Sequence, residues 1–109
     1  MRIDTRARSI PKAVKLRVAE RDSIDGWPCC INCGRPTPDG GIEWSNAHYI
    51  SRAQGGLGIE ENVLTLCPDC HHDFDQTTKR EEMRAFFQEY LMEHYPDWDE
   101  SKLIYQKGR

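Results

Sequence analysis

The sequence has no long hydrophobic run, and this absence excludes a membrane-spanning protein. A helix needs about 20 apolar residues to cross a bilayer, and no apolar stretch approaches that length. Residues 1–6 contain no apolar core of the kind found in a secretory signal, so we expect no signal peptide and a cytoplasmic location. Disulfides are rare in a reducing compartment, where paired cysteines more often bind metal.

Repeats and low-complexity segments are also absent, and the 109 residues fit one domain spanning 1–109. A domain of this size buries a limited core and often needs an additional cross-link, such as a disulfide or a structural metal. The formal net charge of −3 does not by itself indicate a nucleic-acid-binding protein. The charge is uneven, however, because residues 1–21 hold seven basic and two acidic side chains. This segment, with a basic arm over 1–9, can follow phosphates or form a solvated helix face.

The first half of the chain predicts a helix followed by short strands. Residues 9–21 read as a helix, in which Ser9 is the N-cap and Pro11 suits the first turn. The alternating pattern over 42–50 predicts one or two strands, with Ile42, Trp44, His48 and Ile50 facing inward. A glycine-rich loop and a second apolar stretch follow.

The second half of the chain predicts two helices. Pro68 fits the first turn of a helix that runs to about residue 76. Thr78 and Glu81 form a capping box for a packing helix over 78–95, which ends before Pro96. Its broad apolar face consists of Met83, Phe86, Phe87, Tyr90, Leu91 and His94 at helical spacing.

Two Cys-x-x-Cys pairs provide the clearest chemical signal. Thiolates two residues apart in a tight turn can bind one ion, and two such turns complete a tetrahedron. Zinc suits four thiolates because it has no redox chemistry and no conflicting geometric preference. We therefore predict a structural zinc held by Cys30, Cys33, Cys67 and Cys70. Cys29 can replace Cys30 as a ligand, but its spacing to Cys33 is less usual, and we expect it to be a packed bystander.

His48, Asn62 and His71 are the candidates for a second site. A zinc with four protein ligands has no open position, so chemistry must occur at another centre. The segments NAHYISR (46–52) and ENVLTLCPDCHH (61–72), together with the two cysteine pairs, resemble the HNH endonuclease pattern, in particular its small, zinc-stabilised phage type. Each of these three residues alone is a weak signal, whereas the ordered set with both cysteine pairs is specific for the family.

The resemblance covers residues 28–76 and implies an α+β fold. Its core would be a ββα-metal (His-Me) finger flanked by N-terminal and C-terminal helices. It implies that His48 is the general base, since a neutral histidine can take a proton from water. Asn62 would bridge the backbone of the finger, and His71 would bind a catalytic divalent ion, Mg²⁺, Mn²⁺ or another. That ion would polarise the phosphate and stabilise the leaving 3′ oxygen.

Ala47 departs from the family pattern. Many members carry Asp or His immediately before the general base as a second metal ligand, and alanine cannot bind metal. Asp75 lies four residues after His71, so both side chains can share one helix face and hold one ion. His72 points elsewhere and is a weaker candidate, and His48 itself can be a ligand instead.

Three basic residues near the finger are candidates for substrate contacts. Arg52 opens the glycine-rich loop, and Lys79 and Arg80 flank the finger helix. Such side chains position a phosphate backbone without reading sequence, so we expect low intrinsic specificity. The partners that the resemblance suggests are DNA and phage packaging proteins, with no membrane and no small-molecule cofactor.

Two further readings remain open. A non-catalytic zinc ribbon that binds nucleic acid or protein explains the four cysteines equally well. A degenerate HNH domain without activity is favoured by Ala47. A binding module would hold DNA without cutting it when magnesium or manganese is added.

Overall fold

The computed structural model of the protein describes residues 9–105, so the predicted basic arm lies outside the described residues except for Ser9. No helix in this part of the chain has the length and hydrophobicity that a membrane span requires. The helices are α2 (Lys12–Arg21), α3 (Pro68–Gln76) and α4 (Arg80–His94). The strands are β1 (Ser23–Ile24), β2 (Trp27–Pro28), β3 (Ala47–His48) and β4 (Val63–Leu64). Short 3-10 helices are η1 (Arg52–Gln54), η2 (Glu60–Asn62) and η3 (Glu100–Leu103).

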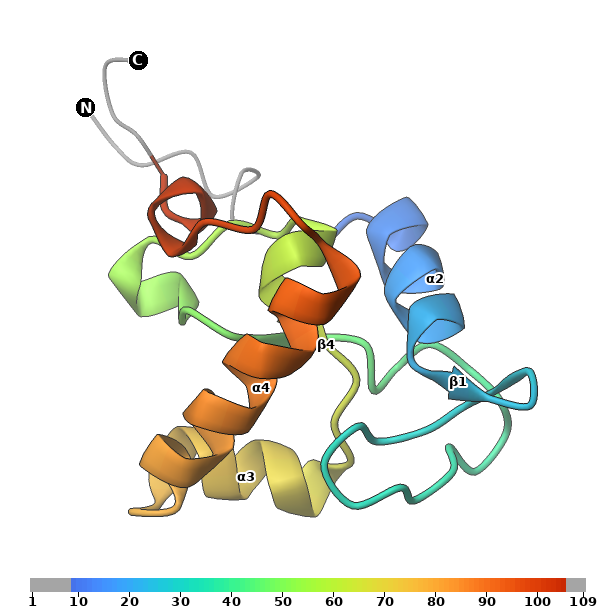
Figure 1. Cartoon of the computed structure of the whole chain (residues 1–109). Helices are drawn as coiled ribbons and strands as arrows, with labels where there is room; N and C mark the ends of the chain where they lie inside the picture. The colour runs from blue at the N-terminus through green and yellow to red at the C-terminus, as the bar shows by residue number, and fades with distance from the viewer. Residues whose placement is uncertain (1–8, 106–109) are drawn as a thin grey trace.

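The centre of the domain is the strand pair β3–β4 followed directly by α3. The strands are antiparallel, with Ala47 opposite Leu64 and His48 opposite Val63. Figure 1 shows α3 and α4 together on one side, with α2 standing apart from them beside β1. The order of strand, strand and helix confirms the predicted α+β class and the ββα-metal arrangement.

The strand β3 is shorter than predicted, and His48 does not face the core. Ala47 and Tyr49 are fully buried, whereas His48 is half-buried and lines a pocket. The predicted alternation of inward-facing side chains over 42–50 was wrong, because residues 42–46 form a loop before the strand. Their spacing to His48 therefore carries no strand periodicity.

Helix α2 packs through a small apolar cluster of its own. Val14 and Val18 are buried against Val63 of β4, with Ile10 partly buried beside them. The helix begins later than predicted, because Pro11 is its N-cap and no side chain caps it. The Pro11 carbonyl accepts hydrogen bonds from the amides of residues 14 and 15, so the predicted Ser9 cap was wrong.

Helix α4 covers α3 and supplies much of the core. Met83, Phe87 and Leu91 are buried, and Phe87 meets Phe74 of α3 edge-on at a ring distance of 5.1 Å. The predicted apolar face was too broad, since Phe86 and His94 are exposed.

The predicted capping box of α4 was also wrong. The helix begins at Arg80, and its N-cap Lys79 makes no side-chain cap hydrogen bond. The hydroxyl of Thr77 takes part in the turn instead, because it donates to the Asp73 carbonyl and accepts from the Lys79 amide. Thr77 thereby closes α3 one residue before the predicted cap, Thr78.

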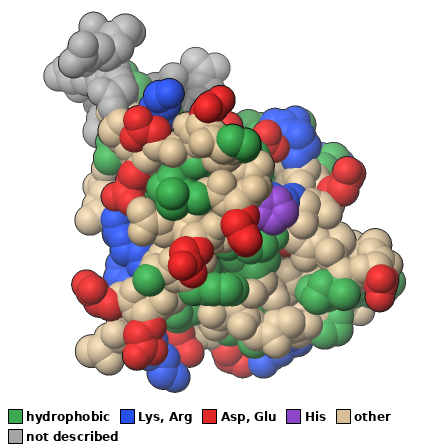
Figure 2. Space-filling model, in the orientation of Figure 1, with side chains coloured by type: hydrophobic (Ala, Val, Ile, Leu, Met, Phe, Trp, Pro, Cys, Tyr) green, Lys and Arg blue, Asp and Glu red, His purple; other side chains and the backbone are tan. Residues whose placement is uncertain are grey.

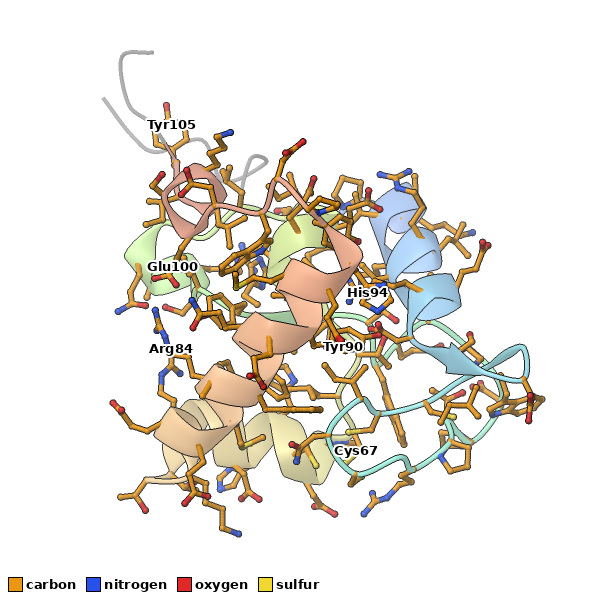
Figure 3. All side chains as sticks on the ribbon, in the orientation of Figure 1. Cys67, Arg84, Tyr90, His94, Glu100 and Tyr105 are labelled. Carbon is orange, nitrogen blue, oxygen red and sulfur yellow. The ribbon has the colours of Figure 1, made fainter. Side chains whose placement is uncertain are left out.

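The C-terminal segment is packed onto the core through Trp98 and Leu103. Leu103 is 2% exposed, and the Trp98 indole donates to the Glu61 carbonyl at 2.9 Å. Arg84 of α4 and Glu100 of η3 form an ion pair of 2.7 Å, and Figure 3 shows these side chains facing each other. Figure 1 shows this segment crossing the top of the domain from the end of α4 to η3.

A buried ion pair joins α2 to the rest of the domain. Arg21 and Asp22 lie 2.7 Å apart with almost no exposed side-chain surface. The Asp22 carboxylate also accepts hydrogen bonds from the Thr65 amide and the Tyr90 hydroxyl. Burial lowers the pKa of Arg21, but the hydrogen bond and charge of Asp22 outweigh it and raise that pKa above its ordinary value. The guanidinium of Arg21 is therefore bound by groups inside the protein.

Candidate functional site

Four cysteine side chains converge at one point between the two turns that carry them. The Sγ atoms of Cys30, Cys33, Cys67 and Cys70 all lie within 4.8 Å of one another. Zinc–sulfur bonds of about 2.3 Å put the sulfurs of a tetrahedral site about 3.8 Å apart. The Sγ atoms of Cys33 and Cys67 are 3.7 Å apart. The predicted cluster is therefore present, and it can hold a metal ion of this kind.

Local backbone structure builds both turns. The Gly34 amide donates to the Cys30 carbonyl, and Gly34 has a φ of +80°, which a residue without a side chain adopts easily. Cys67 is the N-cap of α3, and its Sγ accepts a hydrogen bond from the Cys70 amide. Because α3 starts on the second turn, a metal bound here fixes the beginning of the helix.

The thiols also fit a metal on chemical grounds. Burial raises the pKa of Cys30 and Cys70 above the ordinary value, so these groups do not ionise readily without a nearby cation. The Asn32 side-chain amide donates to Cys70 Sγ at 3.3 Å, which supports a negative sulfur. Cys29 is buried and donates to the Trp27 carbonyl, outside the cluster. Cys30, as predicted, and not Cys29, completes the cluster.

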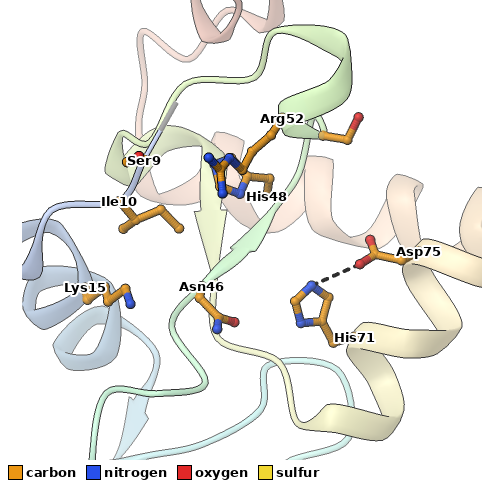
Figure 4. A pocket seen from close by; sticks show the side chains of 9 residues that line it. Ser9, Ile10, Lys15, Asn46, His48, Arg52, His71 and Asp75 are labelled. Atoms are coloured by element: carbon orange, nitrogen blue, oxygen red, sulfur yellow. Dashed lines mark ion pairs between the residues drawn. The ribbon is translucent and has the colours of Figure 1, made fainter. Parts of the chain in front are cut away.

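A polar pocket of about 430 Å³ lies on the other side of the strand pair. It is bounded by the start of α2, by β3 and η1, and by α3. Figure 4 shows His48 facing the interior of this pocket, with His71 and Asp75 together on α3. The residues that line it are Ser9, Ile10, Lys15, Asn46, His48, Ser51, Arg52, His71 and Asp75.

His71 and Asp75 occupy one face of α3, as the four-residue spacing predicts. His71 Nε2 lies 3.1 Å from Asp75 Oδ2, and both side chains are partly exposed to the pocket. A nitrogen and a carboxylate oxygen this close can bind one divalent cation. His72 is exposed and does not line the pocket, which agrees with its being the weaker candidate for a metal ligand.

Ala47 cannot contribute to this pocket because of strand geometry. Adjacent residues in a strand point to opposite faces, and the fully buried Ala47 points into the core while His48 lines the pocket. Asn46 also lines the pocket, and its amide oxygen is a suitable ligand for Mg²⁺ or Mn²⁺. Asn46 was not among the site residues predicted from the sequence, because it lies in the loop before β3, where no strand periodicity identifies it.

Asn62 lies fully buried between two backbone segments. Its side-chain oxygen accepts from the Ile50 amide at 2.8 Å, and its nitrogen donates to the carbonyls of Ile50 and Leu57. Its own carbonyl accepts from the Tyr49 amide. Asn62 therefore ties the end of β3 to the loop that precedes β4, and these are the contacts that a bridging role requires.

The basic residues predicted near the finger divide into two groups. Arg52 lines the pocket, whereas Lys79 and Arg80 do not. Arg80 donates to the Phe74 carbonyl at 3.0 Å, and Lys79 lies 3.6 Å from Asp73. Both contacts stabilise the C-terminal end of α3, so the structure does not bring these two residues to the pocket.

Basic side chains do not form a continuous surface on the face seen in Figure 2. Acidic side chains are dispersed over this face, and the basic ones lie at its margins. Within the pocket, the basic side chains that could meet an anion are Lys15 and Arg52. Lys15 was considered from the sequence only as one of the seven basic residues in 1–21.

Comparison with known proteins agrees with this geometry. Residues 30–74 match the family model of the HNH endonuclease, which confirms the resemblance seen in the sequence. The chain is also 31% identical over 58 residues to the type IV methyl-directed restriction enzyme EcoKMcrA of Escherichia coli (strain K12). That match covers 50% of this chain and 21% of the enzyme, so the chain spans about a fifth of the length of this relative.

Proposed function

We propose that this protein is a metal-dependent endonuclease that hydrolyses phosphodiester bonds in DNA with low intrinsic sequence specificity. The observation that carries the proposal is the pocket shared by His48 and the His71–Asp75 pair. These residues come from different elements and lie within or next to the segment that matches the HNH model. DNA is the substrate class that this family suggests.

Each pocket residue has a distinct role in this proposal. His48 takes a proton from the attacking water as the general base. His71 and Asp75 hold a divalent ion, Mg²⁺ or Mn²⁺, and Asn46 offers an additional oxygen ligand. When bound, the ion supplies Lewis-acid stabilisation of the phosphate and of the leaving oxygen. Arg52 positions the phosphate backbone.

The four-cysteine cluster is proposed to hold a structural zinc that takes no part in catalysis. Its four thiolates would fill the coordination of the ion, so no position is left for water or substrate. The role of this zinc is to fix the N-terminal end of α3 and, through it, His71. The cytoplasmic location, the phage context and a packaging partner stay predictions from the sequence.

A degenerate HNH domain is the second candidate, and one observation favours it. In the described residues, His48, His71 and Asp75 do not form a group of three ligand atoms close enough to share a metal ion, unlike the four cysteines. A domain with this pocket could bind DNA without cutting it. Only an assay of cleavage separates the two candidates.

The test is plasmid cleavage by wild type, His48→Ala and the control variant His72→Ala. We expect wild type and His72→Ala to nick supercoiled plasmid with Mg²⁺ or Mn²⁺ and not with chelator. The His48→Ala rate should fall by about 10²–10⁴ because a general base is lost. All three proteins should contain one equivalent of zinc and melt alike. Equal cutting by His48→Ala contradicts the assigned base, and no cutting by wild type supports the degenerate domain.

A further inference from the structure

The basic residues of α2 are engaged in different ways. Arg21 is buried with Asp22, and Arg17 forms an ion pair of 3.0 Å with Glu60. Lys15 is half-buried at the pocket, and among residues 9–105 no carboxylate lies within ion-pair distance of it. Of these three cations, Lys15 is the one that faces the pocket without a described acidic partner.

The position of Lys15 is set by packing. Val14 and Val18, which flank it on α2, are buried against Val63 of β4. The segment before the helix also lies very close to Gly58, where an added Cβ would stand 2.0 Å from the Ser9 carbonyl oxygen. A glycine at this position permits the approach. The start of α2 is therefore held over the pocket, and a lysine stem that is half-buried loses less freedom on binding.

The charges across the pocket are unequal. Figure 4 shows Lys15 entering from α2 on one side and the His71–Asp75 pair on the other, with Arg52 above them. The His71–Asp75 side can take a cation, whereas the Lys15 side offers a positive charge to an anion. A phosphodiester chain that crosses the pocket can place one phosphate at the metal and a second one at Lys15. A lysine ammonium suits this task because it binds phosphate as a point charge.

We propose that Lys15 binds the phosphate next to the one that is cleaved, so that the DNA strand runs from α2 to α3. This inference rests on the proposed function of the same pocket. Lys15 is a substrate-binding residue in it and takes no part in proton transfer. Lys12 provides a matched control, because it lies on the same helix with the same charge but is exposed and does not line the pocket.

The test measures binding without cleavage. A short fluorescent DNA duplex is titrated with His48→Ala protein in Mg²⁺, and the affinity is measured by anisotropy over a series of NaCl concentrations. Each phosphate that a cation neutralises contributes about 0.9 to the slope of log K against log salt for duplex DNA. Adding Lys15→Gln should lower that slope by about 0.9, while adding Lys12→Gln should leave it unchanged. Lys15→Arg should restore most of the slope.

The outcomes separate this inference from the proposed nuclease. An unchanged slope in Lys15→Gln, an equal change in Lys12→Gln, or no binding of the duplex overturns the role of Lys15. If wild type cuts plasmid and the slope does not change, the nuclease stands and Lys15 does not contact the substrate. If wild type does not cut and the slope falls as expected, the DNA contact stands and the nuclease proposal fails.

Discussion

The four-cysteine cluster and the polar pocket lie at opposite sides of the same small finger, and they are prepared for metal to different degrees. The four sulfurs already lie within 4.8 Å of one another, and three of the cysteines are buried. In the pocket, His71 and Asp75 are 3.1 Å apart and both partly exposed, while His48 stands outside any three-ligand group in the described residues.

This difference indicates separate purposes for the two sites. A closed set of four ligands binds its ion as part of folding, and the ion is then held permanently. A pair of ligands that is partly exposed in a pocket leaves coordination positions for a phosphate and for water. Stability should therefore depend on the cluster, and ion exchange and chemistry should depend on the pocket.

The largest expected effect comes from breaking the cluster. Cys70→Ser, or removal of metal by a chelator, should unfold the domain. Structural zinc contributes about 10–16 kcal/mol in small zinc domains, whereas a whole domain is stable by only about 5–15 kcal/mol. Circular dichroism and zinc content measure the result. Cys29→Ser is the matched control and should keep one zinc and its fold, and a folded, zinc-free Cys70→Ser protein would contradict the structural role.

An intermediate effect is expected at Asn62, which bridges two backbone segments. Asn62→Ala leaves the Ile50 amide and two carbonyls without their partners inside the protein. Unfolding in urea should show a loss of at least about 3 kcal/mol, because three backbone groups lose their partners and each unsatisfied buried group costs about 1–3 kcal/mol. Asn46→Ala removes the same side chain from an exposed position and should change stability by less than about 0.5 kcal/mol. Equal losses in both variants would rule out the bridging role.

The smallest effect on stability is expected in the pocket. His71→Ala should change the free energy of unfolding by less than about 0.5 kcal/mol, because His71 is a partly exposed residue on a helix. The affinity for Mn²⁺, measured by calorimetry on the zinc-loaded protein, should fall at least about tenfold. His72→Ala should leave both quantities as in wild type. Unchanged Mn²⁺ binding in His71→Ala would remove this residue from the metal site.

The parts of the fold that were predicted correctly depend on short-range chemistry. The spacing of Cys67 and Cys70 and the position of Pro68 predicted both the metal turn and the start of α3. The predictions that failed concerned caps and strand phase. Thr78 has the right sequence for a cap, but the neighbouring Thr77 makes the local hydrogen bonds to Asp73 and Lys79 instead, and the capping-box pattern does not distinguish the two threonines.

The same limit applies to the pocket. The His71–Asp75 pair follows from helix periodicity, so the sequence was sufficient to predict it. Lys15 could not be assigned in this way, because α2 meets the finger only after the chain has folded. Asn46 could not be assigned because it lies in a loop, where neither helix nor strand periodicity applies. Arg21 shows the opposite error, since its charge counted toward a basic segment but is neutralised by Asp22 inside the domain.

The carboxylate of Asp22 has a consequence for how such a domain can change during evolution. It contacts Arg21 of α2, the backbone at Thr65 and the hydroxyl of Tyr90 on α4. Replacing any one of these side chains alone would leave a buried charge or hydroxyl without its partner. Residues 21, 22 and 90 should therefore vary together among homologous chains. A helix grafted in place of α2 would need to bring the matching acid and base with it.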